Sequence, residues 1–208
     1  MIVDLLPESI RNKYQVFDYK HAIAILYTEF PQLFIEICDV LEQVQITTAM
    51  ITAPGGNESE IPREFSRILR PLGWAERELT AKIMVDDTEV VRSETHKIDY
   101  IKDRIAFDLE WNSKDQTFDR DLYAFRSFFE YNKISLAILV TRATSLHHYF
   151  GTLGNYTDQH GVTRPVKSKY GASTTHMDKL LGRLKEGRSG GCPVLSFGIT
   201  TQVICDIS

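Results

Sequence analysis

The sequence of 208 residues lacks the features that mark secreted, membrane and zinc-knuckle proteins. Its three cysteines, Cys38, Cys192 and Cys205, are scattered without CxxC spacing, which argues against a disulfide framework or a zinc site. No stretch approaches 18 uncharged apolar residues, so no membrane span is expected. Residues 1–7 lack the basic and apolar regions of a signal peptide. These absences predict a reduced, cytoplasmic protein with no membrane partner.

An excess of charge of one sign is also absent. The 24 Lys and Arg residues stand against 28 Asp and Glu residues, and this net charge of −4 taken alone argues mildly against DNA binding. Disorder is excluded because 11% of the residues are aromatic and no low-complexity tract occurs. The hydrophobic share of 43% suffices for the core of one sizeable domain, so we expect a single domain over residues 1–208.

The hydrophobic spacing mixes helical and strand periods, which predicts an α/β or α+β domain around one sheet. A continuous apolar run at 134–141 is typical of a buried strand. Asp119 and Asp121 are expected to cap the helix that follows them. The pattern predicts strands at 14–19, 80–91, 97–111, 134–141, 193–200 and 203–207, helices at 31–44, 62–73, 121–131 and 175–184, and a long loop at 151–171.

Three carboxylates are predicted to converge in the central third of the chain. Residues 105–111 alternate strictly, which places Asp108 and Glu110 on one face of a strand and Leu109 on the other. If residues 102–104 form a hairpin turn, Asp99 returns alongside that strand. Mg²⁺ prefers oxygen ligands, so two carboxylates with the backbone carbonyl of Leu109 between them can form a metal site. Two acids at i and i+2 are more often a solvated face, and spacing alone leaves both interpretations open.

These acids also resemble the active-site signature of the restriction-endonuclease-like nucleases, an Asp followed later by Asp or Glu, any residue and Lys. More narrowly, residues 98–106 (IDYIKDRIA) resemble the matching block of the BglII/BstYI-type type II restriction endonucleases. Further blocks agree in order at 34–37 (FIEI), 73–76 (GWAE) and 187–195 (GRSGGCPVL), the last leading into 198–199. The resemblance therefore spans most of the chain.

This resemblance implies a restriction-endonuclease-like α/β fold, with a mixed central sheet flanked by helices, and a homodimer that embraces double-stranded DNA. It implies Mg²⁺-dependent hydrolysis, with Mn²⁺ as an alternative cofactor, at a short, GATC-centred palindrome to give 5′-phosphate ends. Carried over by position, Asp99 and Asp108 are metal ligands and Glu110 stands at the usual lysine position. Glu36 is then an upstream helical acid that supports the metal through water.

The sequence departs from these relatives at two positions. Position 110 is Gln in the two type members and Glu here, and position 108 is Asp where they carry Glu. Both changes keep oxygen ligands, and BamHI-like enzymes also carry an acid at position 110. Catalysis is therefore expected, while the metal preference and the general base stay open. Two alternatives remain: a repair or modification-dependent nuclease, and a non-catalytic DNA-binding or regulatory protein on the same fold.

Two segments are predicted to contact DNA. The polar loop after the central strand offers Asn112, Ser113 and Lys114, whose side chains suit base edges or nearby phosphates. Between residues 164 and 188 seven bases stand against two acids, which favours phosphate binding although the total charge is acidic. The residues predicted to contact DNA in this second segment are Lys167, Lys169, Ser173, Thr174, Thr175 and His176.

Two other patterns are interpreted as structural. The adjacent residues His147 and His148 point in different directions and lack a third ligand at useful spacing, so a metal site is not expected there. The aromatic residues at 125, 128, 129 and 131 are expected to pack in the core or at a dimer interface rather than stack on bases.

Overall fold

A six-stranded mixed sheet forms the centre of the molecule, in the order β1-β10-β7-β6-β5-β2. The computed structural model describes residues 2–54, 59–94 and 96–206. Strands β10, β7 and β6 are parallel, whereas β1, β5 and β2 pair antiparallel with their neighbours. The strands are β1 (Tyr14–Tyr19), β2 (Ala75–Arg77), β5 (Ile98–Lys102), β6 (Ile105–Glu110), β7 (Leu136–Arg142) and β10 (Val194–Ile199). This sheet confirms the predicted fold class.

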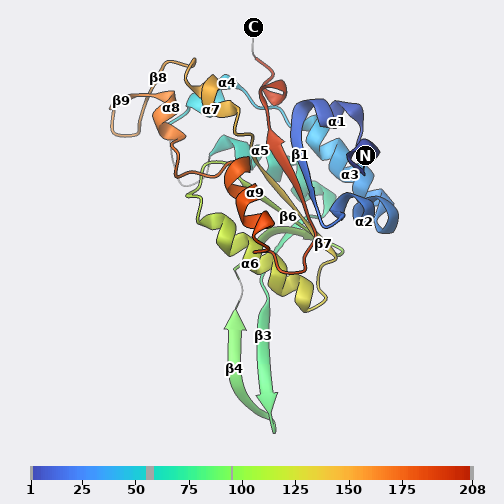
Figure 1. Cartoon of the computed structure of the whole chain (residues 1–208). Coiled ribbons are helices and arrows are strands. Elements are labelled where there is room, and N and C mark those ends of the chain that lie inside the picture. Colours follow the sequence, from blue (N-terminus) through green and yellow to red (C-terminus); the bar gives the residue numbers. More distant parts are fainter. Residues whose placement is uncertain (1, 55–58, 95, 207–208) are drawn as a thin grey trace.

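Helices cover both faces of the sheet (Figure 1). On one face, α6 (Thr117–Glu130) and α9 (Met177–Lys185) pack apolar side chains such as Phe125 and Leu180 against Ala106 and Val194. The other face is covered by α1 (Glu8–Lys13), α2 (Ala22–Glu29), α3 (Pro31–Gln43) and α5 (Glu60–Leu69). Both faces of the central strands are therefore buried, as their continuous apolar sequences predict.

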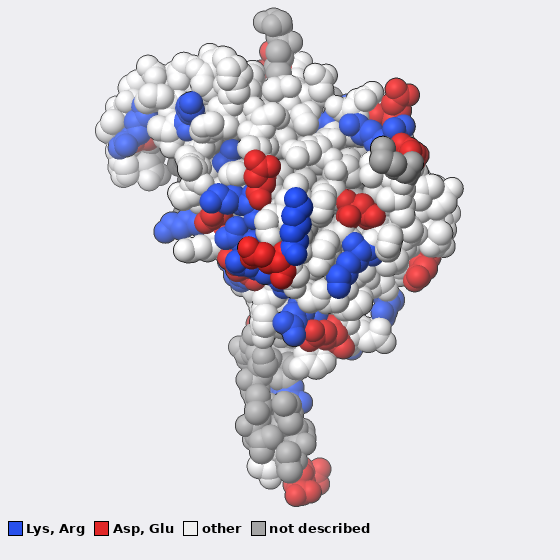
Figure 2. All heavy atoms as spheres, in the orientation of Figure 1, with Lys and Arg blue, Asp and Glu red and all other residues white. Residues whose placement is uncertain are grey.

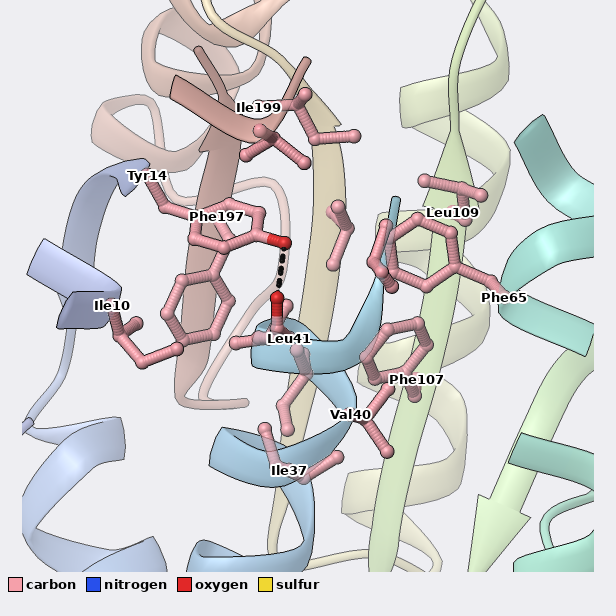
Figure 3. Close-up of a cluster of buried hydrophobic side chains, with 14 of the residues drawn as sticks. Ile10, Tyr14, Ile37, Val40, Leu41, Phe65, Phe107, Leu109, Phe197 and Ile199 are labelled. Carbon is pink, nitrogen blue, oxygen red and sulfur yellow. Dashed lines mark hydrogen bonds between the residues drawn. The ribbon is translucent and has the colours of Figure 1, made fainter. Parts of the chain in front are cut away.

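Helix α3 shows how the sequence builds the second of these layers. Pro31 occupies the first turn, where its missing N–H costs no hydrogen bond, and apolar residues at three-to-four spacing turn inward. Leu41 and Phe107 lie in the same cluster as Tyr14 (Figure 3). The Tyr14 hydroxyl donates to the Leu41 carbonyl over 2.8 Å, which satisfies a buried polar group and ties β1 to α3.

A two-stranded hairpin stands apart from the sheet and extends away from the body (Figure 1). It consists of β3 (Thr80–Val85) and β4 (Thr88–Glu94), with Asp86 and Asp87 at positive φ in the turn. The single strand predicted at 80–91 is therefore two strands. A second small hairpin, β8 (Asn155–Thr157) and β9 (Thr163–Pro165), precedes α8 (Val166–Lys169).

Several predicted elements differ from the structure. The segment 151–171, predicted as a loop, contains β8, β9 and α8. The strand predicted at 203–207 is wrong over residues 203–206, which hold the end of a 3₁₀ helix (Thr201–Val203) and a single bridge from Ile204 to Ile46, while residue 207 lies outside the described residues. Helix α6 begins at Thr117, so Asp119 and Asp121 lie inside it and the capping prediction is wrong.

The remaining elements are short. They are the 3₁₀ helices Ile2–Leu5 and Arg70–Leu72, α4 (Thr48–Thr52) and α7 (Leu146–Phe150). None of the described helices combines the length and apolar character needed to cross a bilayer.

Candidate active site

Strands β5 and β6 bring two of the predicted carboxylates together. They form a hairpin in which residues 100–102 pair with 105–107, and Asp103 takes a positive φ of 50° in the turn. One step before the paired residues, the backbone N–H of Asp99 donates to Oδ1 of Asp108 over 2.7 Å. The predicted hairpin is therefore confirmed, and it places Asp99 beside Asp108.

The two acids on β6 lie in the protein interior. Asp108 is 5% exposed and Glu110 is 8% exposed, whereas Asp99, on β5, is partly surrounded by protein but open to solvent. All six residues of β6 are buried because helices cover both faces of the strand. A pair of solvated surface acids is therefore contradicted by the structure, since buried carboxylates require compensation from donors or cations.

A further acid, Asp121, joins this cluster from helix α6. Asp121 is 3% exposed, and its carboxyl lies close enough to Glu110 for the charge of Glu110 to raise the pKa of Asp121. Nη2 of Arg120 lies 3.3 Å from Oδ1 of Asp121 and 3.6 Å from Oε1 of Glu110. The sequence carried a signal for Asp121: it falls three residues after Phe118 and four before Phe125, on the apolar stripe of the helix.

The environment raises the pKa of every carboxyl in this cluster. Burial raises the pKa of Asp108 well above its usual range, and the charges of Asp121 and Asp99 add to that effect. Burial and the charge of Glu110 raise the pKa of Asp121 well above its usual range in the same way. The pKa of Glu110 and of Asp99 is also raised, chiefly by burial. Removal from water therefore makes the negative charge of this cluster costly.

A cleft of about 460 Å³ opens onto the cluster. Asp99, Leu109 and Glu110 line its sheet side, and Ser66 and Arg70 line it from the end of α5. The cleft continues along the loop after β6, where residues 111–113 and Lys169 form its wall. A ligand in the cleft therefore contacts the acids and the predicted DNA-reading loop at the same time.

The donors of this cluster suit a hard divalent cation. Oε2 of Glu110 and Oδ2 of Asp121 are buried without a hydrogen-bond partner, and carboxylate oxygens are preferred ligands of Mg²⁺. A cation would also offset the charge that burial makes costly. Within the described part of the chain, no three His, Cys, Asp or Glu side chains form a ready-made metal site, so the cation must draw on the backbone carbonyl or on water as well.

Glu36, on α3, pairs with Lys102 at the far end of β5 from Asp99. Its carboxylate accepts hydrogen bonds from Nζ of Lys102 over 2.6 Å and from Nε1 of Trp74 over 2.7 Å. Lys102 lies three residues beyond Asp99, at the turn of the hairpin. The structure thus brings Asp99, Asp108 and Glu110 together but gives Glu36 different partners.

The two segments predicted to contact DNA lie side by side. Residues 113–115 run antiparallel to residues 173–175, with Lys114 bridged to Thr174. The Asp115 N–H donates to the Ser173 carbonyl over 2.9 Å, and the Thr175 N–H donates to the Ser113 carbonyl over 2.9 Å. Two loops about 60 residues apart in sequence therefore form one surface at the edge of the cleft, which spacing could not reveal.

The predicted contact residues differ in their freedom to bind DNA. Lys114, Lys167 and Ser173 are exposed, Ser113, Thr174 and His176 are half-buried, and Thr175 is buried. The Asn112 side chain donates to the Lys169 carbonyl over 3.2 Å. The Lys169 ammonium in turn donates to the carbonyls of Ile51 and Ala53, over 3.1 and 2.6 Å. Asn112 and Lys169 therefore hold the wall of the cleft together.

The basic segment at 164–188 is partly neutralised by neighbouring acids. Figure 2 shows Lys and Arg interleaved with Asp and Glu on the face that carries α9 and α6. The ion pairs join Arg164 to Asp158, Lys179 to Asp115, Arg183 to Asp119, and Arg188 to Asp119 and Glu186. The local excess of positive charge is therefore smaller than the sequence alone indicates.

Comparison with known families gives one match over residues 14–199, to the restriction endonuclease BglII/BglIII family. The chain belongs to this family. No curated protein sequence matches it. The matched range includes the whole hairpin of β5 and β6, both loops at the cleft and all six strands of the central sheet.

Membership of the BglII/BglIII family makes the chain a type II restriction endonuclease, an enzyme that binds double-stranded DNA and cleaves its phosphodiester bonds. Enzymes of this family generally use a divalent metal. The alternative of a non-catalytic DNA-binding protein is therefore not supported. The sequence resemblance assigns the active site to Asp99, Asp108 and Glu110, and in the structure Asp121 lies beside these residues.

Proposed function

We propose that the chain is a Mg²⁺-dependent endonuclease that hydrolyses double-stranded DNA at a short, GATC-centred palindrome and leaves 5′-phosphate ends. It acts in the cytoplasm as a homodimer, because a palindromic duplex presents two equivalent half-sites to two copies of one chain. The observation that carries the proposal is a group of carboxylates with raised pKa values beside an open cleft: Asp99 and Glu110 line the cleft, and Asp108 and Asp121 are buried behind them.

Asp99, Asp108 and the backbone carbonyl of Leu109 would hold the metal ion. When bound, Mg²⁺ would polarise the phosphodiester, lower the pKa of a water ligand and stabilise the leaving 3′-oxygen. Strand β6 is rigid because it is paired on both sides, so it keeps its carboxylates in one fixed arrangement. Mn²⁺ shares the preference for oxygen ligands and would replace Mg²⁺ in this site.

Glu110 would orient the attacking water and accept its proton. Oε2 of Glu110 has no hydrogen-bond partner, so this atom is free to accept one. Arg120 near Oε1 lowers the pKa of Glu110 and opposes the effect of burial, which favours the ionised form needed for a base. Asp121, on α6, would help to orient Glu110 from the other side.

The paired loops at 112–116 and 171–176 would contact the DNA beside the scissile bond. Ser113, Lys114, Ser173, Thr174 and His176 carry the donors and acceptors that read base edges or bind phosphates. Asn112 and Thr175, within the loops, and Lys169, at the end of α8, would support these contacts. For Glu36 to hold metal-bound water, its ion pair with Lys102 would have to open.

A cleavage assay tests the proposal directly. Purified protein is incubated with plasmid DNA and Mg²⁺, Mn²⁺ or a chelator, and the ends of the fragments are sequenced. We expect discrete, metal-dependent fragments that share one palindrome with GATC at its centre. Fragments without a common sequence, or cleavage in excess chelator, would contradict the proposal.

A binding measurement tests the metal site separately. Mg²⁺ that binds only the folded state raises the free energy of unfolding by about 2.7 kcal/mol at one hundred times its Kd. We expect this stabilisation in the wild type and its loss in Asp108→Asn. Equal stabilisation of both proteins would place the ion elsewhere.

A further inference from the structure

A second cavity lies at the end of β7, next to the active site. It has a volume of about 410 Å³ and is lined by the end of β7, by α7 and α8, and by residues 170–172 and 176. Arg142, Thr144, His147, His148, Lys167 and His176 contribute its polar side chains. Over the described residues no Asp or Glu lines this cavity, so its lining carries positive charge only.

Arg142 is the feature that distinguishes this cavity. Its side chain is 1% exposed, and its Nε has no hydrogen-bond partner among the residues that the structure describes. One guanidinium nitrogen donates to the hydroxyl of Thr174, and the guanidinium carbon lies 5.7 Å from the ring centroids of both Phe150 and Tyr170. No carboxylate of the described residues pairs with Arg142.

A buried guanidinium without a counter-charge is costly. Desolvation lowers the pKa of Arg142 to about 10, in the direction expected for a cation removed from water. The aromatic rings offset only part of this cost, because cation–π contacts are worth about 0.5 to 2 kcal/mol each. An anionic ligand in the cavity would supply the missing partner for Arg142.

Other donors surround the same space. Lys167, His147 and His148 are exposed at the rim. His176 is half-buried, and its Nδ1 lies 3.3 Å from the hydroxyl of Thr144, which also accepts the N–H of Asp178 over 3.2 Å. These contacts fix the imidazole and leave Nε2 as its unengaged nitrogen. The cavity therefore combines a planar guanidinium with flexible and imidazole donors, which suits a phosphate group.

The position of the cavity connects it to DNA. Thr141 on β7 pairs with Glu110 on β6, and Arg142 is the next residue along β7. Helix α8 separates the two spaces, with Lys167 lining the cavity and Lys169 lining the active-site cleft. Thr174, which receives the hydrogen bond from Arg142, lies in the loop that pairs with Lys114. A duplex seated on the paired loops therefore passes beside the cavity.

We propose that this cavity binds a phosphate group of the DNA backbone other than the one being cleaved, through Arg142 with Lys167 and His176. The identity of DNA as the source rests on the proposed function, whereas the anion site rests on the cavity itself. Engagement of the phosphate would also hold the loop at 171–176 in place through the bond from Arg142 to Thr174.

The first arm of the test measures anion binding without metal or DNA. The melting temperature is recorded in a chelating buffer with inorganic phosphate or with chloride at equal ionic strength. In the wild type, we expect phosphate to raise the melting temperature in proportion to the logarithm of its concentration. Two variants, Arg142→Gln and Ser145→Glu, should lose this rise, because one removes the guanidinium and the other adds an acid at the rim.

Ser145→Glu keeps the proposal testable if Arg142→Gln fails to fold. Ser145 is exposed and its side chain makes no capping hydrogen bond at the start of α7, so the substitution leaves the core intact. Gln32→Glu, on the exposed side of α3, is the matched control for an added negative charge. This control should keep the full response to phosphate.

The second arm measures the affinity for a DNA duplex as a function of salt, again without metal. Binding affinity falls with salt, and the loss of one phosphate contact makes the plot of log affinity against log salt concentration less steep by about 0.9. We expect this decrease for Ser145→Glu and Arg142→Gln, and no decrease for Gln32→Glu. Because cleavage is not measured, failure of the proposed function leaves both arms readable.

Two results would overturn the inference. A wild-type melting temperature that responds equally to phosphate and chloride would remove the anion site. A phosphate response that the variants abolish, combined with an unchanged salt slope for DNA, would assign the site to a free phosphate compound and overturn the assignment to DNA.

Discussion

The ends of the neighbouring strands β6 and β7 carry buried charge of opposite sign. At the end of β6, Asp108 and Glu110 lie beside Asp121, and among the described residues their ion-pairing neighbour is the exposed Arg120. At the end of β7, Arg142 is buried beside aromatic rings and a hydroxyl, and no acid in the described part of the chain pairs with it. The fold therefore keeps these charges apart although the strands are adjacent.

This separation distinguishes a binding surface from a structural ion pair. Elsewhere in the molecule charges are neutralised internally, as in the pair of Glu36 and Lys102. An internal salt bridge between β6 and β7 would satisfy both partners but would leave nothing for a ligand to compensate. The arrangement instead matches the two components of the proposed complex, a divalent cation at the acids and a phosphate at the guanidinium.

The largest expected effect is on cleavage by Asp108→Asn. Loss of a carboxylate that we propose as a metal ligand would remove several kcal/mol of transition-state stabilisation, so we expect the cleavage rate to fall by about a thousand-fold or more. Initial rates on plasmid DNA measure the effect. Asp39→Asn, on an exposed position of α3, is the matched control and should keep the wild-type rate. Full activity of Asp108→Asn would end the assignment of the acidic cluster.

Asp121→Asn tests the acid that the helix contributes. We expect cleavage to fall by about 10- to 100-fold, with a higher Mg²⁺ concentration needed for half-maximal rate, because groups that orient metal ligands act on this scale. In chelating buffer the same variant should be more stable than the wild type, since a buried charge is lost. Greater stability with an unchanged Mg²⁺ dependence would make Asp121 structural only.

Glu110→Gln tests whether the acidic end of β6 and the basic end of β7 have opposite effects on DNA binding. In the absence of metal, the acids repel DNA phosphate, so we expect this variant to bind duplex DNA a few-fold more tightly, on the order of 1 kcal/mol for charges near a protein surface. Ser145→Glu should act in the opposite direction. Equal affinity of both variants and the wild type would show that neither region faces the DNA.

Glu36→Gln separates an internally neutralised pair from the active site. We expect a loss of about 1 kcal/mol in the free energy of unfolding, because the pair with Lys102 is largely but not fully buried. Urea denaturation provides the measurement, and Lys102→Gln should produce a similar loss. If the Mg²⁺ dependence of cleavage shifts by 10-fold or more, Glu36 supports the metal after all.

The smallest expected effect is the difference in reactivity between buried and exposed thiols. Burial raises the pKa of Cys38 and Cys192 to about 12, so at pH 8 only about one thiol in 10⁴ is ionised. Cys205 is exposed. We therefore expect a thiol reagent to label Cys205 of the native protein, as located by peptide mass. Rapid labelling of Cys38 or Cys192 would show that the helices packed on the sheet open in solution.

Several features of the site could be predicted from sequence because they depend on local rules. Strict alternation on β6 and a turn at residues 102–104 place Asp99 beside Asp108 through strand periodicity and hairpin pairing. The order of the four sequence blocks at 34–37, 73–76, 98–106 and 187–195 indicated the family, which the match over residues 14–199 shows. The predicted boundaries of β7, α9 and β10 also lie within two residues of the structure.

Other features depend on contacts between segments far apart in the chain. The sequence pattern of α6 suggested caps at Asp119 and Asp121, but the helix begins earlier and buries Asp121 against Glu110. Lys169 was predicted to bind DNA, yet its ammonium is held by the carbonyls of Ile51 and Ala53, more than 100 residues away. Such partners cannot be inferred from spacing, because spacing describes only one element at a time.

Local residue patterns predicted a hairpin that joins Asp99 to Asp108, and they predicted carboxylates of the kind that a hard cation prefers. Packing between distant segments buries Asp108 beside Asp121 and leaves Arg142, on the next strand, without an acidic partner among the described residues. The physical reason is that the cost of a charge depends on its solvent and its neighbours, and both are set when the helices close over the sheet.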